Sequence, residues 1–115
     1  AFGNHANHGD CRACHIHGKQ VPIIEEALAY ADEFLLTAAG QRNRNHTGGF
    51  VRFEDVPFAM EEILFDPQTS GGLLIALSQA AAPQPLQQLR GIGLPAAIVG
   101  EVGDIADVEI RISND

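Results

Sequence analysis

The amino-acid sequence predicts an α+β fold, a two-layer α/β sandwich in which helices pack on a mixed sheet. Three observations lead to this fold class. Apolar residues recur at three- and four-residue steps from residue 23 onward, as on one face of a helix. Short apolar runs at 73–77 and 96–102 have the length of strands. The length of 115 residues, of which 45% are apolar, suits one domain with its own core.

The first half of the chain is predicted to contain a strand, a helix, a loop and a second strand. Residues 13–17 form a short strand, and residues 23–35 form a helix that ends by Gly40. Residues 41–49 are polar and predict a loop, whereas residues 50–53 alternate as a short strand does. The side chains expected on the apolar face of the helix are Ile24, Ala27, Leu28, Ala31 and Leu35.

The second half is predicted to alternate helices and strands. Pro57 suits the first turn of a helix, and residues 73–77 lack a polar face and therefore predict an interior strand. Leu86 and Leu89 are expected to point inward from a short helix. A strand, a helix and a strand at this spacing predict a crossover unit, right-handed if its strands are parallel. The elements are a helix at 55–64, a strand at 73–77, a helix at 83–90 and strands at 96–102 and 108–112.

Composition excludes several classes of protein. Seven basic and fifteen acidic residues give a net charge of −8, which disfavours binding to nucleic acid. No apolar run approaches the roughly 20 residues of a membrane span. Two cysteines do not make a disulfide framework, and no secretory signal precedes the first helix, so we expect a cytoplasmic protein.

The loop before the apolar run at 73–77 is a candidate anion-binding loop. Asp66 and Pro67 have turn chemistry, and two hydroxyls and two glycines follow them. A polar loop that leads into a buried strand can hold backbone N–H groups toward a phosphate. The alternative is a structural turn whose glycines permit tight packing. The candidate residues of this anion-binding loop are Asp66, Gln68, Thr69, Ser70, Gly71 and Gly72.

The string FDPQTSGGLLIAL at residues 65–77 closely resembles the signature near the C-terminus of selenophosphate synthetase (selenide, water dikinase). Residues 21–28 and 40–44 resemble that family's helix and the glycine–arginine–asparagine loop after it, and residues 98–112 resemble its closing strands. The resemblance covers residues 20–112 well. It implies one domain over residues 1–115, with the fold of the C-terminal domain of the aminoimidazole ribonucleotide synthetase-like superfamily at 21–115 and a divergent segment at 1–20.

The resemblance implies an enzyme that converts selenide, ATP and water to selenophosphate, AMP and phosphate. In that family the reactive cysteine or selenocysteine, the lysine, the nucleotide segment and most magnesium-binding aspartates belong to the N-terminal part. ATP and Mg²⁺ are therefore cofactors of the whole enzyme, the N-terminal catalytic domain is a partner, a homodimer is expected, and this chain alone is predicted to be inactive. Lys19 is its one lysine and lacks P-loop spacing. The alternative is a free-standing, non-catalytic module that binds a metal or a protein partner.

Two further groups are candidate sites. Arg42, Asn43 and Arg44 offer donors suited to an anion, although surface arginines commonly have no specific role. A cysteine–histidine segment has the two-residue gap at Cys11 and Cys14 that allows both thiolates to bind one Zn²⁺. Haem attachment, disorder of residues 1–12, a divergent strand and an error in the recorded sequence remain alternatives. The candidate metal ligands are Cys11, Cys14, His15, His17, His5 and His8.

Overall fold

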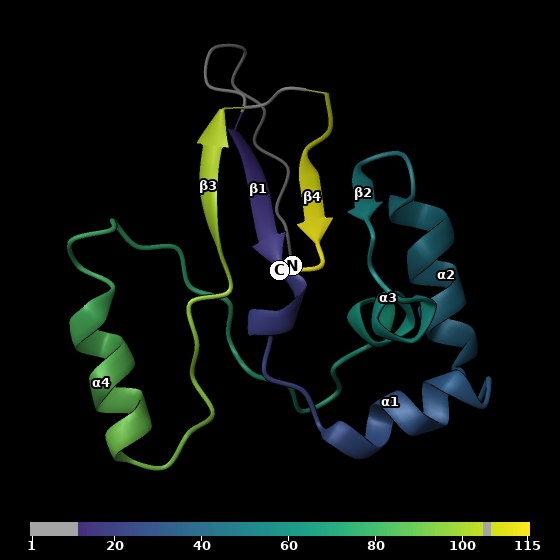
Figure 1. Ribbon diagram of the computed structural model, residues 1–115, viewed down its shortest axis with the longest axis horizontal. Helices are drawn as coiled ribbons and strands as arrows, with labels where there is room; N and C mark the ends of the chain where they lie inside the picture. The colour runs from purple at the N-terminus through teal and green to yellow at the C-terminus, as the bar shows by residue number, and fades with distance from the viewer. Residues whose placement is uncertain (1–11, 105–106) are drawn as a thin grey trace.

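The structure, a computed structural model, describes residues 12–104 and 107–115 and contains a four-stranded mixed sheet with four α-helices (Figure 1). The strand order is β2-β4-β1-β3. The α+β class with a mixed sheet is thus confirmed. The elements are β1 (Arg12–His17), a 3₁₀ turn η1 (Gly18–Gln20), α1 (Glu25–Asp32), α2 (Ala38–Thr47), β2 (Val51–Glu54), α3 (Phe58–Phe65), α4 (Pro83–Gly91), β3 (Gly100–Asp104) and β4 (Ile110–Ser113).

The sheet joins segments that lie far apart in the sequence. β4 runs parallel to β1 on one side and to β2 on the other, whereas β3 pairs antiparallel with β1. The register places His15 opposite Glu101 and His17 opposite Ser113. One residue beyond β1's last pair with β3, the His17 N–H donates to the Val99 carbonyl at 2.8 Å. Polar side chains of β1, β3 and β4 therefore meet around the end of β1.

The buried core lies where α3 meets α1, α2 and the sheet. These three helices gather on the β2 side, whereas α4 lies on the β3 side (Figure 1). The Phe53 ring on β2 meets the Phe65 ring on α3 edge to face, with 5.4 Å between the ring centres. No α4 side chain is buried, and Leu86 and Leu89 are only half-buried. The buried apolar residues are Ala31, Ala59, Met60, Phe65 and Ile112.

The predicted helix at 23–35 is shorter than expected, and its apolar face is only partly buried. α1 ends at Asp32 because Phe34 adopts a left-handed conformation with φ 59°, and the Leu35 N–H then bonds back to the Tyr30 carbonyl. A bond of this span closes a helix C-terminus. Ala31 is buried, but Ile24 and Leu35 lie outside the helix and are exposed.

The loop predicted at 41–49 is wrong, since α2 extends to Thr47. Thr37 caps this helix, because its hydroxyl accepts a hydrogen bond from the Gly40 N–H at 3.0 Å. Gly40 is therefore part of the first turn of α2 and does not end the preceding helix. Polar composition led to the wrong prediction, because α2 is held by its cap and by polar contacts with α3.

The interior strand predicted at 73–77 is also wrong, and so is the crossover unit built on it. In the structure these residues form no regular element, and Leu73 is 89% exposed. An interior strand needs neighbours on both edges, but β1 and β4 already have two each. Of the predicted strand at 96–102, only the part from Gly100 onward belongs to β3, which pairs antiparallel.

The remaining predicted elements match the structure to within a few residues. They are β1, β2, α3, α4 and β4. The prediction that residues 1–12 are poorly ordered concerns a segment that, apart from Arg12, lies outside the described residues. None of the helices in the described ranges has the length and apolar character needed to span a bilayer.

Candidate functional site

The loop that follows α3 is anchored at its first residue. The Thr37 hydroxyl donates to Asp66 Oδ1 at 2.6 Å while it accepts from the Gly40 N–H. A Cβ at Gly40 would lie 3.2 Å from the Thr37 hydroxyl, so glycine gives this junction its close packing. Asp66 thus fixes the start of the loop against the N-terminus of α2, and its role toward a ligand stays a prediction.

The rest of the loop is exposed. Gln68, Thr69 and Ser70 are exposed, and the Gly71 N–H closes a turn onto the Gln68 carbonyl at 3.4 Å. Neither Gly71 nor Gly72 has a positive φ, so left-handed strain is not the reason for these glycines. A Cβ on Gly71 would lie 2.4 Å from the Gln68 Cβ, whereas one on Gly72 would meet nothing within 4 Å. The loop presents two hydroxyls and its backbone to solvent.

Arg44 links α2 to α3. Its Nη1 lies 2.9 Å from Glu61 Oε2, and its Nη2 lies 2.5 Å from Glu62 Oε1 in an ion pair that lacks hydrogen-bond geometry. The guanidinium also lies over the Phe65 ring, 4.8 Å from its centre. Burial disfavours the charge, but the neighbouring carboxylates of Glu61 and Glu62 outweigh it and raise the pKa of Arg44. The cation is already neutralised within the domain.

The other two residues of the predicted anion contact diverge. The Asn43 amide donates to the Phe65 carbonyl at 2.8 Å and so secures the end of α3. Arg42 is exposed. The structure therefore separates the three candidates, and a shared role in anion binding stays a prediction.

A second polar cluster surrounds the end of β1. His17 Nδ1 lies 3.0 Å from Asp115 Oδ1, and its Nε2 lies 2.9 Å from Glu101 Oε2. His15 Nε2 lies 2.7 Å from the Ser113 hydroxyl, and the two imidazole ring centres are 4.4 Å apart. The Ser113 hydroxyl also donates to Asp115.

The carboxylates of this cluster favour the charged imidazole. Hydrogen bonds to Glu101 and then Asp115 raise the pKa of His17 above its ordinary value of 6.5. The hydrogen bond from His17 lowers the pKa of Glu101. The Ser113 hydroxyl, followed by His17, lowers the pKa of Asp115 to about 2. Near neutral pH the cluster therefore contains two carboxylates and a readily protonated histidine.

The structure places the candidate metal ligands in different positions. His15 and His17 lie on one face of β1, while Cys14, which directly precedes His15 in the strand, lies on the other. Cys11, His5 and His8 lie outside the described residues, so the proposed cysteine–histidine set stays a prediction. Sequence reasoning missed Glu101, Ser113 and Asp115. Alternation could have paired Ser113 with Asp115, but only the strand register brings them to the histidines.

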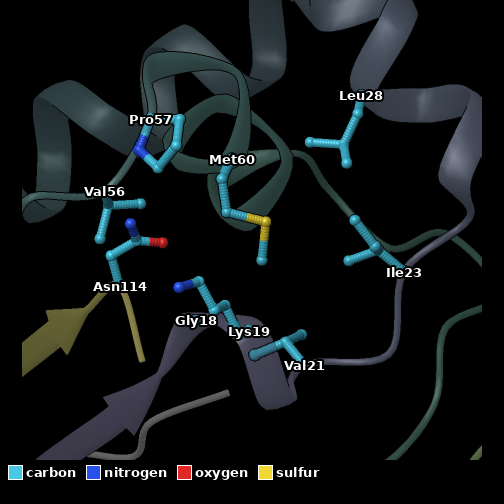
Figure 2. A pocket seen from close by; sticks show the side chains of 9 residues that line it. All are labelled: Gly18, Lys19, Val21, Ile23, Leu28, Val56, Pro57, Met60 and Asn114. Carbon is cyan, nitrogen blue, oxygen red and sulfur yellow. The ribbon is translucent and has the colours of Figure 1, made fainter.

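A cavity of about 220 Å³ lies between η1, α1, α3 and the end of β4. Figure 2 shows Met60 reaching into it from α3, with Leu28, Ile23 and Val21 along one side. The Lys19 ammonium and the Asn114 amide lie on the other side, near Val56 and Pro57 (Figure 2). The lining is mostly apolar, and neither polar group has a carboxylate partner among the lining residues.

Comparison with known proteins identifies the origin of the loop sequence. A selenide, water dikinase from Agathobacter rectalis is 54% identical over 94 residues, which cover 81% of this chain and 28% of that protein. This chain is a relative of the selenide, water dikinases. Proteins of the same name from Desulfitobacterium hafniense and Treponema denticola are 48% and 36% identical, over 71% and 83% of the chain and 24% and 28% of their own lengths. No protein-family model matches the chain.

The resemblance to selenophosphate synthetase is thereby confirmed at the level of the sequence. The chain spans about a quarter of the length of the curated relatives that it matches. The described part is accordingly a selenophosphate synthetase-like domain with an anchored, exposed loop and a separate histidine–carboxylate cluster.

Proposed function

We propose that this chain serves as the C-terminal domain of an ATP-dependent selenophosphate synthetase, which forms selenophosphate, AMP and phosphate from selenide, ATP and water. The observation that carries the proposal is the 54% identity to a curated selenide, water dikinase over 94 residues. That relative is a selenide, water dikinase, and the chain carries the loop sequence by which it resembles that family.

In this proposal the chain supports catalysis, and its described residues do not supply the metal chemistry. Mg²⁺ prefers oxygen ligands, commonly one or two carboxylates with substrate phosphates. Among the described residues, the grouped metal ligands are His15, His17 and Asp115, in which two of three donors are imidazoles. This donor set does not fit Mg²⁺, so we assign nucleotide-bound Mg²⁺ to the remainder of the enzyme.

The exposed loop is the part of this domain that we assign to the phosphate side of the active site. Asp66 holds the loop on the domain through its hydrogen bond with the Thr37 hydroxyl. Thr69 and Ser70 are exposed, so their hydroxyls can face a ligand. Hydroxyls and backbone N–H groups can bind a phosphate without a formal charge. A cytoplasmic homodimer, as expected from the resemblance, belongs to the same proposal.

The apolar run after the loop supports a domain partner. Leu73, Leu74 and Ile75 are 89%, 65% and 58% exposed, which is unusual for consecutive large apolar side chains. The matched relatives are about four times as long as the segment they share with this chain. We therefore assign the cover of this run to the N-terminal catalytic domain of the same enzyme.

A chimaera tests the proposal. Residues 21–115 replace the matching segment of the Agathobacter rectalis relative, and selenide-dependent AMP release is measured. We expect the chimaera to be active and the 115-residue chain alone to be inactive.

A double substitution in the chimaera, Thr69→Val with Ser70→Ala, should raise the KM for ATP about tenfold if a hydroxyl binds phosphate. The control Ser78→Ala, which removes an exposed hydroxyl beyond the run, should leave the KM unchanged. Activity of the isolated chain, or a folded but inactive chimaera, contradicts the proposal.

A further inference from the structure

Three strands bring imidazole and carboxylate side chains onto one face of the sheet. His15 and His17 share a face of β1 because they are two residues apart. Glu101 on β3 is the register partner of His15, and Ser113 on β4 is the register partner of His17. Asp115 follows Ser113 by two residues. One ligand atom from each of His15, His17 and Asp115 lies within 4.8 Å of the others, the one such group within the described ranges.

We propose that His15, His17 and Asp115 bind one divalent transition-metal cation of the Zn²⁺ class. Imidazole nitrogens and a carboxylate oxygen are ligands that Zn²⁺ accepts at about 2.0–2.2 Å. The site differs from the thiolate site that the sequence suggested, since Cys14 faces away from it. It also does not depend on selenophosphate synthesis.

Each imidazole has one nitrogen toward the Ser113–Asp115 segment and the other beside Glu101. His17 presents Nδ1 to Asp115 at 3.0 Å, and its Nε2 bonds Glu101 at 2.9 Å. A carboxylate on the far nitrogen of a metal-binding histidine fixes its tautomer and raises its basicity. Glu101 is therefore a positioning residue for His17.

Glu101 also lies beside His15. Its Oε1 is 3.3 Å from His15 Nδ1, where it can accept a proton from that nitrogen and leave Nε2 unprotonated for a metal. In the structure, Arg111 Nη2 lies 3.1 Å from the same Nδ1, and because a guanidinium only donates, Nδ1 accepts and the proton of neutral His15 lies on Nε2, beside the Ser113 hydroxyl at 2.7 Å. Metal binding at Nε2 therefore requires that the His15 proton move to Nδ1, that Arg111 turn away and that Ser113 rotate aside.

The local charge favours a cation. Glu101 and Asp115 contribute two carboxylates, and the charge of Arg111 is shared with Glu54, 3.8 Å away. Without a metal, a proton on His17 satisfies the same carboxylates. Metal and proton therefore compete for His17, and affinity should fall as the pH is lowered.

Calorimetric titration of ZnCl₂ into the full chain tests the site. We expect about one Zn²⁺ per chain near pH 7.5, with release of protons. His17→Ala and Asp115→Asn should each weaken binding at least tenfold. Asp115→Glu, which keeps the carboxylate, should retain more of the affinity than Asp115→Asn. Bound Co²⁺ should show visible d–d absorption without a thiolate charge-transfer band.

Matched controls separate this site from other ligands of the chain. Three control variants should leave the affinity for Zn²⁺ unchanged. They are His46→Ala, at an exposed position of α2, Cys14→Ser, and the double variant His5→Ala with His8→Ala. Loss of binding in the Cys14 variant would indicate a thiolate site, and loss in the His5 and His8 variant an N-terminal histidine site. Either result, or the absence of a 1:1 phase, overturns the proposal. If His17→Ala does not fold by circular dichroism, Asp115→Asn, an exposed position, decides the question.

Discussion

At the scale of single residues, Arg44 and His17 are both cations held between two carboxylates, but in different surroundings. Glu62 is 5% exposed and depends on Arg44 for its neutralisation. Removing one partner of a buried pair leaves an uncompensated charge, which costs more than the pair itself contributes. His17 and its partners lie close to water, where such pairs contribute little and respond to pH.

Arg44→Ala should lower the free energy of unfolding by about 3 kcal/mol, because it leaves Glu62 buried without a cation. The control is Arg42→Ala on the same helix. Arg42 is exposed, so this substitution should change the free energy of unfolding by less than about 0.5 kcal/mol. Urea denaturation measures both. Replacing both partners, Arg44→Met with Glu62→Leu, should recover most of the loss. Equal effects of the two arginine variants would show that the pair is not buried in solution.

His17→Gln should change stability in a pH-dependent way. The pKa of His17 is raised, so its stabilisation is present below the ordinary value of 6.5 and is lost as the pH rises through the folded-state pKa. The pKa values of Glu101 and Asp115 are lowered, so their stabilisation is present above the ordinary values of 4.5 and 3.8 and is lost as the pH falls. The contribution is therefore largest between about 4.5 and 6.5.

The measurement is the melting temperature of the wild type and of His17→Gln in buffers with chelator. The difference should be largest near about pH 5.5 and smaller near about pH 8 and pH 2.5. His46→Gln is the control, because His46 is exposed on α2 outside this cluster. A difference that is constant with pH would contradict the assigned ion pairs.

At the scale of elements, the antiparallel pairing of β1 with β3 depends on one glycine. A Cβ on Gly100 would lie 2.0 Å from the His15 carbonyl oxygen, a backbone atom that cannot move aside alone. A Cβ on Gly103, in the same strand, would meet nothing within 4 Å. The close approach at Gly100 also sets the position of Glu101 beside the two histidines.

Gly100→Ala should destabilise the domain by about 1–3 kcal/mol, because β1 and β3 must separate to admit the methyl group. Gly103→Ala should be neutral or slightly stabilising, since alanine restricts the unfolded chain. Thermal unfolding of both variants measures the difference. A tolerated alanine at Gly100 would show that the two strands are further apart than described.

Sequence reasoning succeeded for elements whose local signals suffice. α3 was predictable because Pro57 suits a helix start and apolar residues follow, and β1, β2, α4 and β4 were found nearly in place. α2 was missed because its stability comes from the Thr37 cap and from Arg44, contacts that composition does not reveal. The strand predicted at residues 73–77 was wrong because an apolar run indicates that its side chains favour burial, but it does not indicate which strand would pair with it. The sequence marked the two histidines as candidate ligands, but the carboxylates beside them could be found only from the strand register.

At the scale of the whole molecule, the domain leaves an unusual amount of apolar surface uncovered. The buried apolar residues are few and lie around α3, while α4 and the run at 73–77 contribute none. Such a distribution is expected of a domain that packs against a larger protein. Stability of the isolated chain and stability within the enzyme should therefore respond to different residues.

Leu73→Ser should leave the melting temperature of the isolated chain unchanged, because this side chain is 89% exposed. In the chimaera with the Agathobacter rectalis relative, the same change should lower the melting temperature, because the proposal has the N-terminal domain cover the run there. Ile112→Ala is the control: it is 5% exposed in β4 and should cost about 2–5 kcal/mol in either protein. Equal tolerance of Leu73→Ser in both proteins would show that the N-terminal domain does not cover this surface.

The strand order has a consequence for how the domain folds during translation. Among the described strands β1 comes first in the sequence, yet its two neighbours are residues 100–104 and 110–113, so the ribosome must add some 80 residues after β1 before either can pair with it. α3 contacts both α1 and α2, and these helices can assemble during that interval. In nascent chains arrested before residue 100, we expect the helices to resist protease and β1 to be cleaved. Synthesis of the segment that contains β3 and β4 is then the step that completes the sheet.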